Sequence, residues 1–563
     1  VDYSAIEGSV DMPWADDNVF DIIPVYTDRS KGDYSISNLS PVIGQGTSSF
    51  ESYSAPSVDI LGASRPSSNL DMGAYENSLA SSAAPLPVSK IAGAAKSNSV
   101  YLTWPSTKIS LSGTSDAANI KYLIYEGGSQ IGTSLSTSFT AASLTNGITY
   151  SFKVAAQDTS STLIGALSKA VSVTPTYTGP YWYVAFSGGS SSNTVDADLG
   201  SREVPLNHMS SALELAAAGD TIVMMKGTHT GSSNRGVNWN ASKSLVIMGD
   251  PDYVADSTII DAGAKDSHFI FNSREDSTYQ VIGLTLYNGK ITDNYGGGSV
   301  SVDNNSSPVF KKVIFKQNVN LADSWDGGGA VSVRNYSRPS FYYCTFDGNT
   351  VRRTGDNQSE ANGGAVWIIG SSNSESQVVL FDGCTFKNNI ARGNWGARGG
   401  AIRAYESQVS ITNSLFYGNM TFANEDGLNT YSSNGGAIDI TGPSYYSSNE
   451  QQWVGSQVKI INSTIVNNLT KTGNSDVAAS SGSGVYLTSW GRSEKAWFFN
   501  NIVWGNKTGS GDSWQQIYFE NESGWSRKYL NYNVVQSSED ITCLLYTSPS
   551  PRDRTRNRMP SSA

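Results

Sequence analysis

Glycines and apolar residues recur in a fixed pattern along the C-terminal half of the chain. Gly-Gly-Ala followed by Val or Ile occurs at 328–331, 363–366, 399–402 and 435–438, with weaker copies at 297–300 and 482–485. The second glycine falls at 298, 329, 364, 400 and 436, which gives spacings of 31 to 36 residues. Such a period is the sequence signature of a solenoid, in which each repeat forms one coil and buries its apolar side only by stacking on the next.

A second motif alternates with the glycines, an apolar residue followed three positions later by asparagine. Its copies are Phe315/Asn318, Phe346/Asn349, Phe386/Asn389, Phe416/Asn419, Ile465/Asn468 and Val503/Asn506. We therefore predict that each coil contains a Gly-Gly-Ala strand, a turn, a strand such as 408–412, and a turn at Phe-x-x-Asn. Paired glycines permit a tight bend and close contact between layers. Stacked Phe would fill a narrow interior, and stacked Asn would hydrogen-bond along the axis.

The start of the unit 180–542 predicts a cap on the solenoid. An alanine-rich helix is expected over 209–218, with Met209, Leu213 and Ala216 on one face. A helix in this place would cover the first coil, whose core and strand edges would otherwise be open to water.

These motifs and the cap resemble those of secreted bacterial right-handed parallel β-helix proteins of the pectate-lyase-like superfamily. The glycine and Phe-x-x-Asn motifs are also similar to the repeats of polymorphic outer-membrane proteins, over about 295–508. The resemblance implies an all-β chain with a right-handed parallel β-helix and an N-terminal capping helix. It also implies adhesion at a cell surface, associated with an outer membrane.

Residues 85–175 show the period-two alternation of a β-sandwich. Leu102 and Trp104 alternate on one predicted strand, and Tyr150 and Phe152 on another. The segment 144–150, Leu-Thr-Asn-Gly-Ile-Thr-Tyr, fits a tyrosine corner, in which the phenol hydrogen-bonds to nearby backbone. The unit resembles a fibronectin type III domain. We expect it to act as a spacer, because it carries no RGD or other obvious ligand motif.

Residues 1–80 carry little hydrophobic core of their own. The segments 39–44, 59–66 and 71–76 resemble the closing segment of secreted bacterial parallel β-helix proteins, whose ends often contain SPAIGxG, DxxGxxRP and DMGAYE. This resemblance covers about forty residues and implies that 1–80 is the C-terminal segment of a preceding β-helix. The chain begins at Val1 rather than Met, so we expect an internal fragment of a longer protein.

The last residues, 543–563, do not continue the repeat. Cys543 to Asp553 back-translate to a sequence that resembles a transposase adapter used in sequencing libraries, and Arg558 to Ala563 fit its far end. We interpret 543–563 as an adapter-derived artefact and exclude it from the fold. The alternative is a natural basic tail.

Charge and composition limit the kinds of molecule that the protein is expected to bind. Lys and Arg number 38 against 49 Asp and Glu, a net charge of −11, and the body of the chain has no basic cluster. Nucleic acid and anionic membranes are therefore poor candidate partners. No run of about 18 apolar residues predicts a membrane span. Three His and three Cys nearly exclude zinc sites and a disulfide framework. We expect an extracellular or cell-surface monomer.

Two of the cysteines, Cys344 and Cys384, occupy the same place in neighbouring repeats, two residues before Phe346 and Phe386. Equal parity places them on the same inward face. We predict buried, reduced thiols on neighbouring strands, with a disulfide as the less favoured alternative.

The polar residues do not form the catalytic motifs of enzymes with related folds. Polygalacturonase-like hydrolysis needs clustered Asp with G-H-G and R-x-K, and pectate-lyase-like elimination is associated with R-x-P-x-x-R. The sequence contains neither G-H-G nor R-x-P-x-x-R. His208 and His229 precede the repeats and are expected to be cap residues, and His268 is expected to be structural as well. No catalytic residue is assigned from the sequence.

Polar loops of variable length precede the Gly-Gly-Ala strands, at 323–326, 352–360, 394–398 and 425–433. Variable loops on one side of a solenoid usually form its binding side. Their carboxylates are Asp356, Glu360, Glu425 and Asp426. These could bind Ca²⁺ with help from carbonyl groups, but no calcium-loop repeat supports this, and solvated acidic loops are the favoured alternative. No other cofactor is predicted.

The residue between the two inward side chains of each Gly-Gly-Ala strand should point outward. Alignment of the repeats gives one outward ladder: Ser301, Ser332, Trp367, Arg403, Asp439 and Tyr486. Two positions further lies a second: Asp303, Arg334, Ile369, Tyr405, Thr441 and Thr488. We predict that the aromatic residues stack on sugars while the charged residues bind hydroxyl or carboxylate groups. The alternative is a solvated face on which Arg403 pairs with Asp439.

Two function classes remain. The first is a secreted or cell-surface protein that binds glycans or surfaces through Trp367, Arg403, Asp439, Tyr486, Tyr405, Arg334 and Asp303. The second is a polysaccharide lyase or other polysaccharide-degrading enzyme that acts on acidic glycans. An extracellular polysaccharide or cell-surface glycan is the partner in both, and the fold alone cannot separate them.

Overall fold

The computed structural model describes residues 4–5, 19–20, 24–50, 52–109, 119–239, 243–292, 296–322, 327–353, 360–370, 378–424, 433–441, 444–447, 452–455, 457–473, 481–488, 494–509, 516–520 and 525–536. The predicted tail, 543–563, lies outside these residues. Contacts divide the chain into two compact units. The first comprises Val1–Thr178 with Val195–Asp198, and the second Gly179–Thr194 with Leu199–Ala563.

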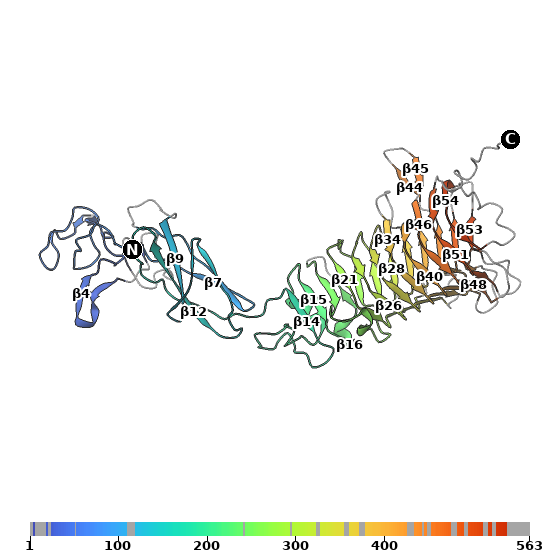
Figure 1. Cartoon of the computed structure of the whole chain (residues 1–563), viewed down its shortest axis with the longest axis horizontal. Helices are drawn as coiled ribbons and strands as arrows, with labels where there is room; N and C mark the ends of the chain where they lie inside the picture. Colours follow the sequence, from blue (N-terminus) through green and yellow to red (C-terminus); the bar gives the residue numbers. More distant parts are fainter. Residues whose placement is uncertain are drawn as a thin grey trace, which may run out of the picture. The chain divides into compact units, whose positions relative to one another are not determined.

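The second unit is a parallel β-helix, as the repeats predict (Figure 1). Successive strands pair in parallel with the strand one coil away, and a complete coil contributes one strand to each of four sheets. The eleven-stranded sheet contains β14 (Tyr181–Val184), β15 (Thr221–Met224), β18 (Val246–Gly249), β21 (Gln280–Ile282), β25 (Val309–Lys311), β29 (Ser340–Tyr342), β34 (Val378–Asp382), β39 (Gln408–Thr412), β46 (Gln457–Ile461), β50 (Glu494–Phe499) and β54 (Trp525–Asn531).

The ten-stranded sheet follows it around each coil after a short bend. It contains β16 (Gly227–His229), β19 (Thr258–Asp261), β22 (Thr285–Tyr287), β26 (Ile314–Lys316), β30 (Thr345–Asp347), β35 (Thr385–Lys387), β40 (Leu415–Tyr417), β47 (Thr464–Val466), β51 (Ile502–Trp504) and β55 (Val534–Val535). Next comes the seven-stranded sheet: β23 (Lys290–Ile291), β27 (Val319–Asn320), β31 (Thr350–Arg353), β36 (Ile390–Gly393), β41 (Met420–Ala423), β48 (Leu469–Thr472) and β52 (Lys507–Thr508).

The nine-stranded sheet carries the Gly-Gly-Ala strands and closes the coil. It contains β17 (Val237–Asn238), β20 (Phe269–Phe271), β24 (Val300–Val302), β28 (Val331–Val333), β33 (Val366–Ile369), β38 (Ile402–Tyr405), β43 (Ile438–Thr441), β49 (Val485–Thr488) and β53 (Ile517–Glu520). A three-stranded sheet precedes three of these strands: β32 (Ala361–Asn362), β37 (Ala397–Arg398) and β42 (Ser433–Asn434). The antiparallel hairpin β44 (Ser444–Ser447) and β45 (Gln452–Gly455) is inserted after β43.

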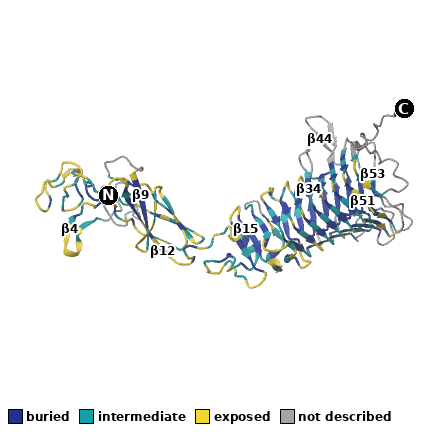
Figure 2. Ribbon diagram, in the orientation of Figure 1, coloured by how far each residue is buried: buried dark blue, intermediate teal, exposed yellow. Residues whose placement is uncertain are grey.

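Stacked phenylalanines fill the interior behind the ten-stranded sheet. Phe315, Phe346, Phe386 and Phe416 are fully buried, and the ring centroids of successive coils lie 4.5–4.6 Å apart with nearly parallel planes. These distances match the spacing of hydrogen-bonded strands. The predicted apolar stack is therefore confirmed. Buried and less buried residues alternate along the stacked strands (Figure 2).

The asparagines of Phe-x-x-Asn form the predicted ladder at the bend between the ten- and seven-stranded sheets. Asn389 is typical: its Nδ2 donates to the carbonyl oxygen of Phe346 at 3.0 Å and to Oδ1 of Asn419 at 2.9 Å. Its own Oδ1 accepts from the backbone N–H of Asn349 at 3.0 Å. Each buried amide thus bonds along the axis and to the bend, which satisfies polar groups that the interior would otherwise leave unpaired.

The paired glycines have two separate physical roles. In three strong repeats the first glycine has positive φ, as at Gly363 (65°), which lets the chain turn sharply into the strand. The second glycine packs against the next coil: a Cβ added to Gly364 would lie 2.0 Å from the carbonyl oxygen of Gly400. Only glycine fits this contact between layers.

The capping helix is α1, Met209–Leu215, and it contacts β14 and β15 of the first coils. Met209, Ala212 and Ala216 are buried, whereas Leu213 is half-buried, so the buried face differs from the predicted one by one position. Lys243 donates to the carbonyl oxygen of Leu213 at 2.9 Å, near the end of the helix. None of the helices in the described part of the chain has the length and apolar character of a membrane span.

Cys344 and Cys384 are buried free thiols, as predicted. Both lie in the bend between the eleven- and ten-stranded sheets rather than on neighbouring strands. Cys344 follows β29 and precedes β30, and its Sγ lies 3.5 Å from the carbonyl oxygen of Phe310. Burial raises the pKa of the Cys344 thiol, and the neighbouring Cys384 adds to this shift. The protonated, inert form is therefore favoured.

In the first unit, seven strands form two antiparallel sheets over one shared core. The strands are β7 (Ala92–Lys96), β8 (Ser99–Thr103), β9 (Ile120–Glu126), β10 (Ser129–Ser134), β11 (Ser138–Ala141), β12 (Tyr150–Asp158) and β13 (Val171–Val173). The hydroxyl oxygen of Tyr150 accepts from the backbone N–H of Thr145 at 2.9 Å, which confirms the predicted tyrosine corner. Trp104 is buried in the same core.

The N-terminal segment of this unit contains short strands: β1 (Ser4–Ala5), β2 (Val19–Phe20), β3 (Tyr26–Asp28), β4 (Asp33–Ile36), β5 (Ser49–Phe50) and β6 (Tyr53–Ser54). Residues of its sequence motifs form hydrogen bonds and an ion pair with one another. Arg65 pairs with Glu76 at 2.7 Å and donates to the carbonyl oxygen of Gly73. Asp59 accepts from the backbone of Leu61 and Glu76. These charged residues therefore organise turns, which explains the motif without a catalytic role.

Candidate functional site

The ladder predicted on the nine-stranded sheet exists in register but is not exposed. Ser332 pairs with Trp367, Trp367 with Arg403, Arg403 with Asp439, and Asp439 with Tyr486. However, the exposed fractions of Trp367, Arg403, Asp439 and Tyr486 are 4, 5, 0 and 5 %. The predicted open sugar-binding face is therefore wrong for these four residues. The solvated ion pair that was its alternative is wrong as well, because the pair is buried.

The buried ladder residues form a charge cluster. The guanidinium of Arg403 donates to the Asp439 carboxylate and, at 2.8 Å, to the hydroxyl of Thr441. It also lies 5.8 Å from the ring centroid of Trp367 and 5.6 Å from that of Tyr405, within the range of cation–π attraction. Trp367 thus contacts a cation of its own chain, so its presence needs no external sugar.

A second arginine joins the cluster from the three-stranded sheet. Arg398, on β37, lies 3.8 Å from Asp439 and pairs with Glu360 at 2.9 Å. Burial raises the pKa of the Asp439 carboxyl, and the guanidinium groups of Arg403 and Arg398 oppose this shift. Burial also lowers the pKa of Arg403. The segment before Gly399 and Gly400 therefore brings a charged side chain onto the ladder.

The remaining residues of the predicted binding set lie in the second ladder. Asp303, Arg334 and Tyr405 are half-buried. Asp303 accepts from Nδ2 of Asn335 at 2.6 Å, in the turn that follows the strand. The structure does not join Asp303 and Arg334 with Trp367 and Tyr486 into one open surface.

The predicted calcium ligands are tested only at Glu360, which pairs with Arg398. Asp356, Glu425 and Asp426 lie outside the described residues. Within the described ranges, no group of three or more His, Cys, Asp or Glu side chains is arranged to hold a metal ion.

The buried histidines have structural partners. Nε2 of His268 lies 2.9 Å from the carbonyl oxygen of Ile260, and Nδ1 lies 3.0 Å from the hydroxyl of Ser299. Burial lowers the pKa of His268 to about 4, so the ring is neutral at pH 7. His229 lies 2.8 Å from the carbonyl oxygen of Met225, and burial lowers its pKa as well.

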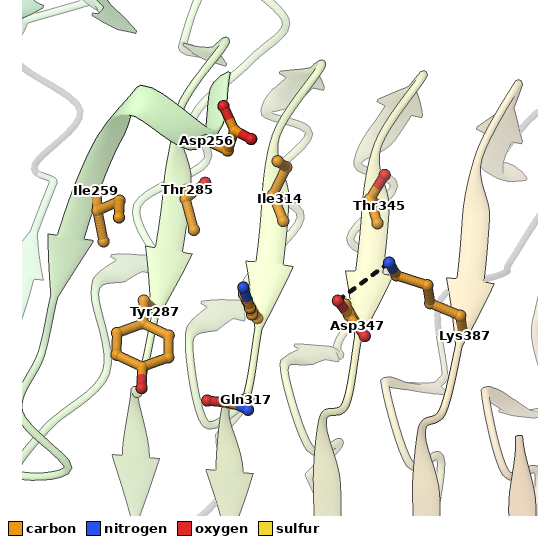
Figure 3. Close-up of a pocket in the computed structure, with 10 residues that line it drawn as sticks. Asp256, Ile259, Thr285, Tyr287, Ile314, Gln317, Thr345, Asp347 and Lys387 are labelled. Carbon is orange, nitrogen blue, oxygen red and sulfur yellow. Dashed lines mark ion pairs between the residues drawn. The ribbon is translucent and has the colours of Figure 1, made fainter. Parts of the chain in front are cut away.

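The outer face of the ten-stranded sheet carries a groove instead. The groove has a volume of about 480 Å³ and is lined by residues of β19, β22, β26, β30 and β35 and of the short 3-10 helix η5 (Ala255–Ser257). In Figure 3, Tyr287 and Asp347 lie on strands of the same sheet with one strand between them, and a dashed line joins Asp347 to Lys387 on the next strand. The groove thus runs across the strands, in the direction along which a chain-like ligand would meet one coil after another.

Five residues form one row along this groove and its continuation, which we call the five-rung ladder. They are Tyr287, Lys316, Asp347, Lys387 and Tyr417, each paired in register with the next. Lys316 is exposed and the other four are half-buried. Lys387 pairs with Asp347 at 3.2 Å, whereas no ion pair joins Lys316 to any residue that the structure describes.

Beyond Tyr417 the same row becomes apolar. Val466 follows on β47 and Trp504 on β51, where the Trp504 side chain is 49 % exposed. Ile502 and Val534, in the adjacent row, are 45 and 55 % exposed. The outer face of the ten-stranded sheet is therefore polar and charged over five coils and apolar with an exposed indole over the last ones.

The signal for this face was present in the sequence. Each ladder residue from Lys316 to Tyr417 directly follows the inward Phe of a Phe-x-x-Asn motif. The alternation rule that placed Trp367 and Arg403 outward places these residues outward too. Alternation along a strand shows which side chains point outward. It does not show which outward row is covered by other parts of the chain.

Comparisons with known proteins identify no family for this chain. No family model matches it, and no curated protein matches it. Among solved structures it is similar to pectate lyase Pel9A (17 % identity, TM-score 0.28, covering 63 % of this chain and 76 % of that one). It is also similar to a Family 28 exopolygalacturonase of Yersinia enterocolitica (10 %, 0.18, 81 % and 100 %) and to pectate lyase Pel3 of Pectobacterium carotovorum (12 %, 0.12, 78 % and 98 %). These scores carry no argument about function, and the fold rests on the sheets described above.

Proposed function

We propose that the β-helix binds an extracellular polysaccharide along the outer face of its ten-stranded sheet. The observation that carries this proposal is the groove that crosses five coils, with aromatic, cationic and anionic side chains in one continuous row. A flat sheet repeats every 4.8 Å or so, which suits a polymer of similar repeat. The exposed Trp504 extends the row with a surface on which a sugar ring can stack.

The other parts of the chain fit this function as supports. The β-sandwich serves as a spacer, and the protein acts as a monomer outside the cell or at its surface, where polysaccharides occur. The buried cluster of Arg403 and Asp439 contributes to stability of the solenoid rather than to ligand contact.

The test is binding of the whole chain to a panel of purified polysaccharides, followed by calorimetry on those that bind. Trp504→Ala and Tyr417→Ala should each weaken binding by about 0.5–1.5 kcal/mol, because each removes one stacking surface. Tyr336→Asn is the control: Tyr336 is 48 % exposed with φ 63°, on the turn after β28, and Asn tolerates that backbone. Binding that is absent throughout the panel, or that neither Trp504→Ala nor Tyr417→Ala weakens relative to the natural chain, would reject the proposal.

A second candidate function, cleavage of an acidic polysaccharide, has one observation in its favour. Glu360 and Arg398, whose side chains are 22 and 28 % exposed, place a carboxylate and a cation together at the edge of the buried cluster. Elimination from a uronate needs a base and a cation that neutralises the carboxylate. Incubation with polyuronates should then release unsaturated products, and Glu360→Gln should abolish them. No product from any polyuronate would remove this candidate.

A further inference from the structure

Resting on the proposed function, we propose that the five-rung ladder selects a polysaccharide in which neutral and acidic sugars alternate. Along the stack the ladder presents tyrosine, lysine, aspartate, lysine and tyrosine, in that order. The sequence of charges is neutral, positive, negative, positive, neutral. Its period is two coils, which matches a disaccharide repeat rather than a single sugar.

The spacing of the coils is fixed at these strands. The Phe residues that directly precede Lys316, Asp347 and Lys387 stack with centroids 4.6 and 4.5 Å apart. Lys316 and Lys387 therefore originate about 9 Å apart, twice the spacing between strands. A polymer that advances about one sugar per coil would bring every second sugar to a lysine.

The two lysines favour carboxylates at those sugars. Lys316 is exposed in the groove, and its ammonium group has no carboxylate partner in the described part of the chain. The Lys387 side chain is 30 % exposed and leans toward Asp347 at 3.2 Å, so it keeps donors for an incoming anion. A carboxylate above each lysine would gain a charge-assisted hydrogen bond.

Asp347 disfavours a carboxylate on the sugar between them. It lies on the strand between the two lysines, and its side chain is 23 % exposed. A neutral sugar can donate a hydroxyl hydrogen bond to this carboxylate, whereas an acidic sugar would be repelled. Asp347 thus acts against polymers that are charged at every sugar.

The tyrosines continue the same alternation at both ends. Tyr287 and Tyr417 each lie one coil beyond a lysine, where the alternating polymer places another neutral sugar. A phenol ring offers an apolar face for stacking and a hydroxyl for hydrogen bonding. Five successive sugars, neutral at the first, third and fifth, would therefore meet matching side chains.

The experiment compares three probes on the whole chain by calorimetry at low salt with a calcium chelator present. Hyaluronan carries one carboxylate per disaccharide, polygalacturonate carries one on every sugar, and dextran carries none. We expect hyaluronan to bind about tenfold more tightly than polygalacturonate, with an affinity that falls as salt rises. Dextran should bind more weakly than hyaluronan.

Three variants separate the roles of the ladder residues. The double variant Lys316→Gln/Lys387→Gln should lower hyaluronan affinity about tenfold and remove most of its salt dependence. Asp347→Asn should raise polygalacturonate affinity several-fold while leaving hyaluronan within about twofold, because Asn still accepts a hydroxyl hydrogen bond. The control Tyr336→Asn should change the affinity for neither hyaluronan nor polygalacturonate.

The outcomes distinguish this inference from the proposed function. Binding of dextran or polygalacturonate at least as tight as that of hyaluronan, if weakened by Tyr417→Ala, would overturn the alternating pattern while the proposed function stands. Hyaluronan binding that is unchanged in the double lysine variant would also overturn the inference. Binding of no polysaccharide at all would overturn both.

Discussion

The nine-stranded and ten-stranded sheets of the β-helix carry charged ladders built by the same rule, yet they differ in exposure. In both, an outward residue lies beside inward apolar residues, and parallel pairing aligns it with its counterpart one coil away. On the nine-stranded sheet the result is a buried Arg403–Asp439 pair, and on the ten-stranded sheet an accessible Asp347–Lys387 pair. The same arrangement, a row of charged residues aligned by parallel strand pairing, therefore serves stability on one sheet and, as we propose, binding on the other.

The difference arises from what precedes each strand. A glycine with positive φ, the first of its pair, turns the chain sharply into the nine-stranded sheet, and the three-stranded sheet before it contributes Arg398 to the ladder. From β22 onward the ten-stranded sheet is entered by a short bend of two residues, as at Tyr343 and Cys344 between β29 and β30. Such a bend brings no additional segment over the outer face of these coils, so that face stays open apart from η5 beside β19.

The largest effect is expected from breaking the buried pair. Asp439→Ala should lower the free energy of unfolding of the β-helix by about 3–5 kcal/mol, because it leaves the buried guanidinium of Arg403 without its carboxylate partner. Urea unfolding followed by tryptophan fluorescence measures this loss. Arg403→Met/Asp439→Leu should recover most of it, since the pair is replaced by apolar side chains. A loss below 1 kcal/mol for Asp439→Ala would show that the pair is not buried in solution.

The next effect concerns the asparagine ladder that borders the ten-stranded sheet. Asn389→Ala removes a side chain that bonds to Asn349, Asn419 and the carbonyl group of Phe346. We expect a loss of about 2–4 kcal/mol, because buried polar groups are left without partners. The control is Asn388→Gly, at an exposed position with φ 56°, where glycine keeps the backbone conformation. Equal losses in both variants would show that the ladder adds no specific stability.

Sequence alone predicted the repeat, the stacked Phe and Asn, the register of the ladders and the capping helix, because each depends on spacing that recurs along the chain. It did not predict the burial of Trp367 and Arg403. Side-chain parity follows from the backbone of one strand, whereas burial depends on segments that return from elsewhere. The repeated glycines led to a predicted binding site on the Gly-Gly-Ala strands. Lys316 and Lys387 were not predicted, because their importance depends on the groove around them.

The third prediction concerns the pH dependence of stability, which tests the burial of His268 directly before β20 of the nine-stranded sheet. Burial lowers the pKa of His268 to about 4, whereas an unfolded histidine has a pKa near 6.5. Below pH 6.5 the unfolded chain binds more protons than the folded one, so stability is complete above that pH and falls as the pH drops toward 4. At pH 5 this histidine alone should cost about 2 kcal/mol.

Unfolding in urea at pH 7.5 and pH 5, with and without His268→Gln, isolates this contribution. The variant should lose less stability between the two pH values than the natural chain does. His229, whose pKa is also lowered by burial, shifts stability in the same direction and remains in both proteins. A pH dependence that His268→Gln leaves unchanged would contradict the burial of this ring.

The smallest effect on stability is expected from a substitution in the exposed five-rung ladder of the ten-stranded sheet. Lys387→Ala should change the free energy of unfolding by less than about 1 kcal/mol, because its partner Asp347 remains hydrated and the side chains are 30 and 23 % exposed. Urea unfolding beside Asp439→Ala gives the direct contrast between the two sheets. If Lys387→Ala destabilised the β-helix as strongly as Asp439→Ala, the outer face of the ten-stranded sheet would be structural. A negligible change, together with weakened polysaccharide binding, would instead separate the two charged ladders by role: residues that hold the coils together on one sheet, and residues free to meet a ligand on the other.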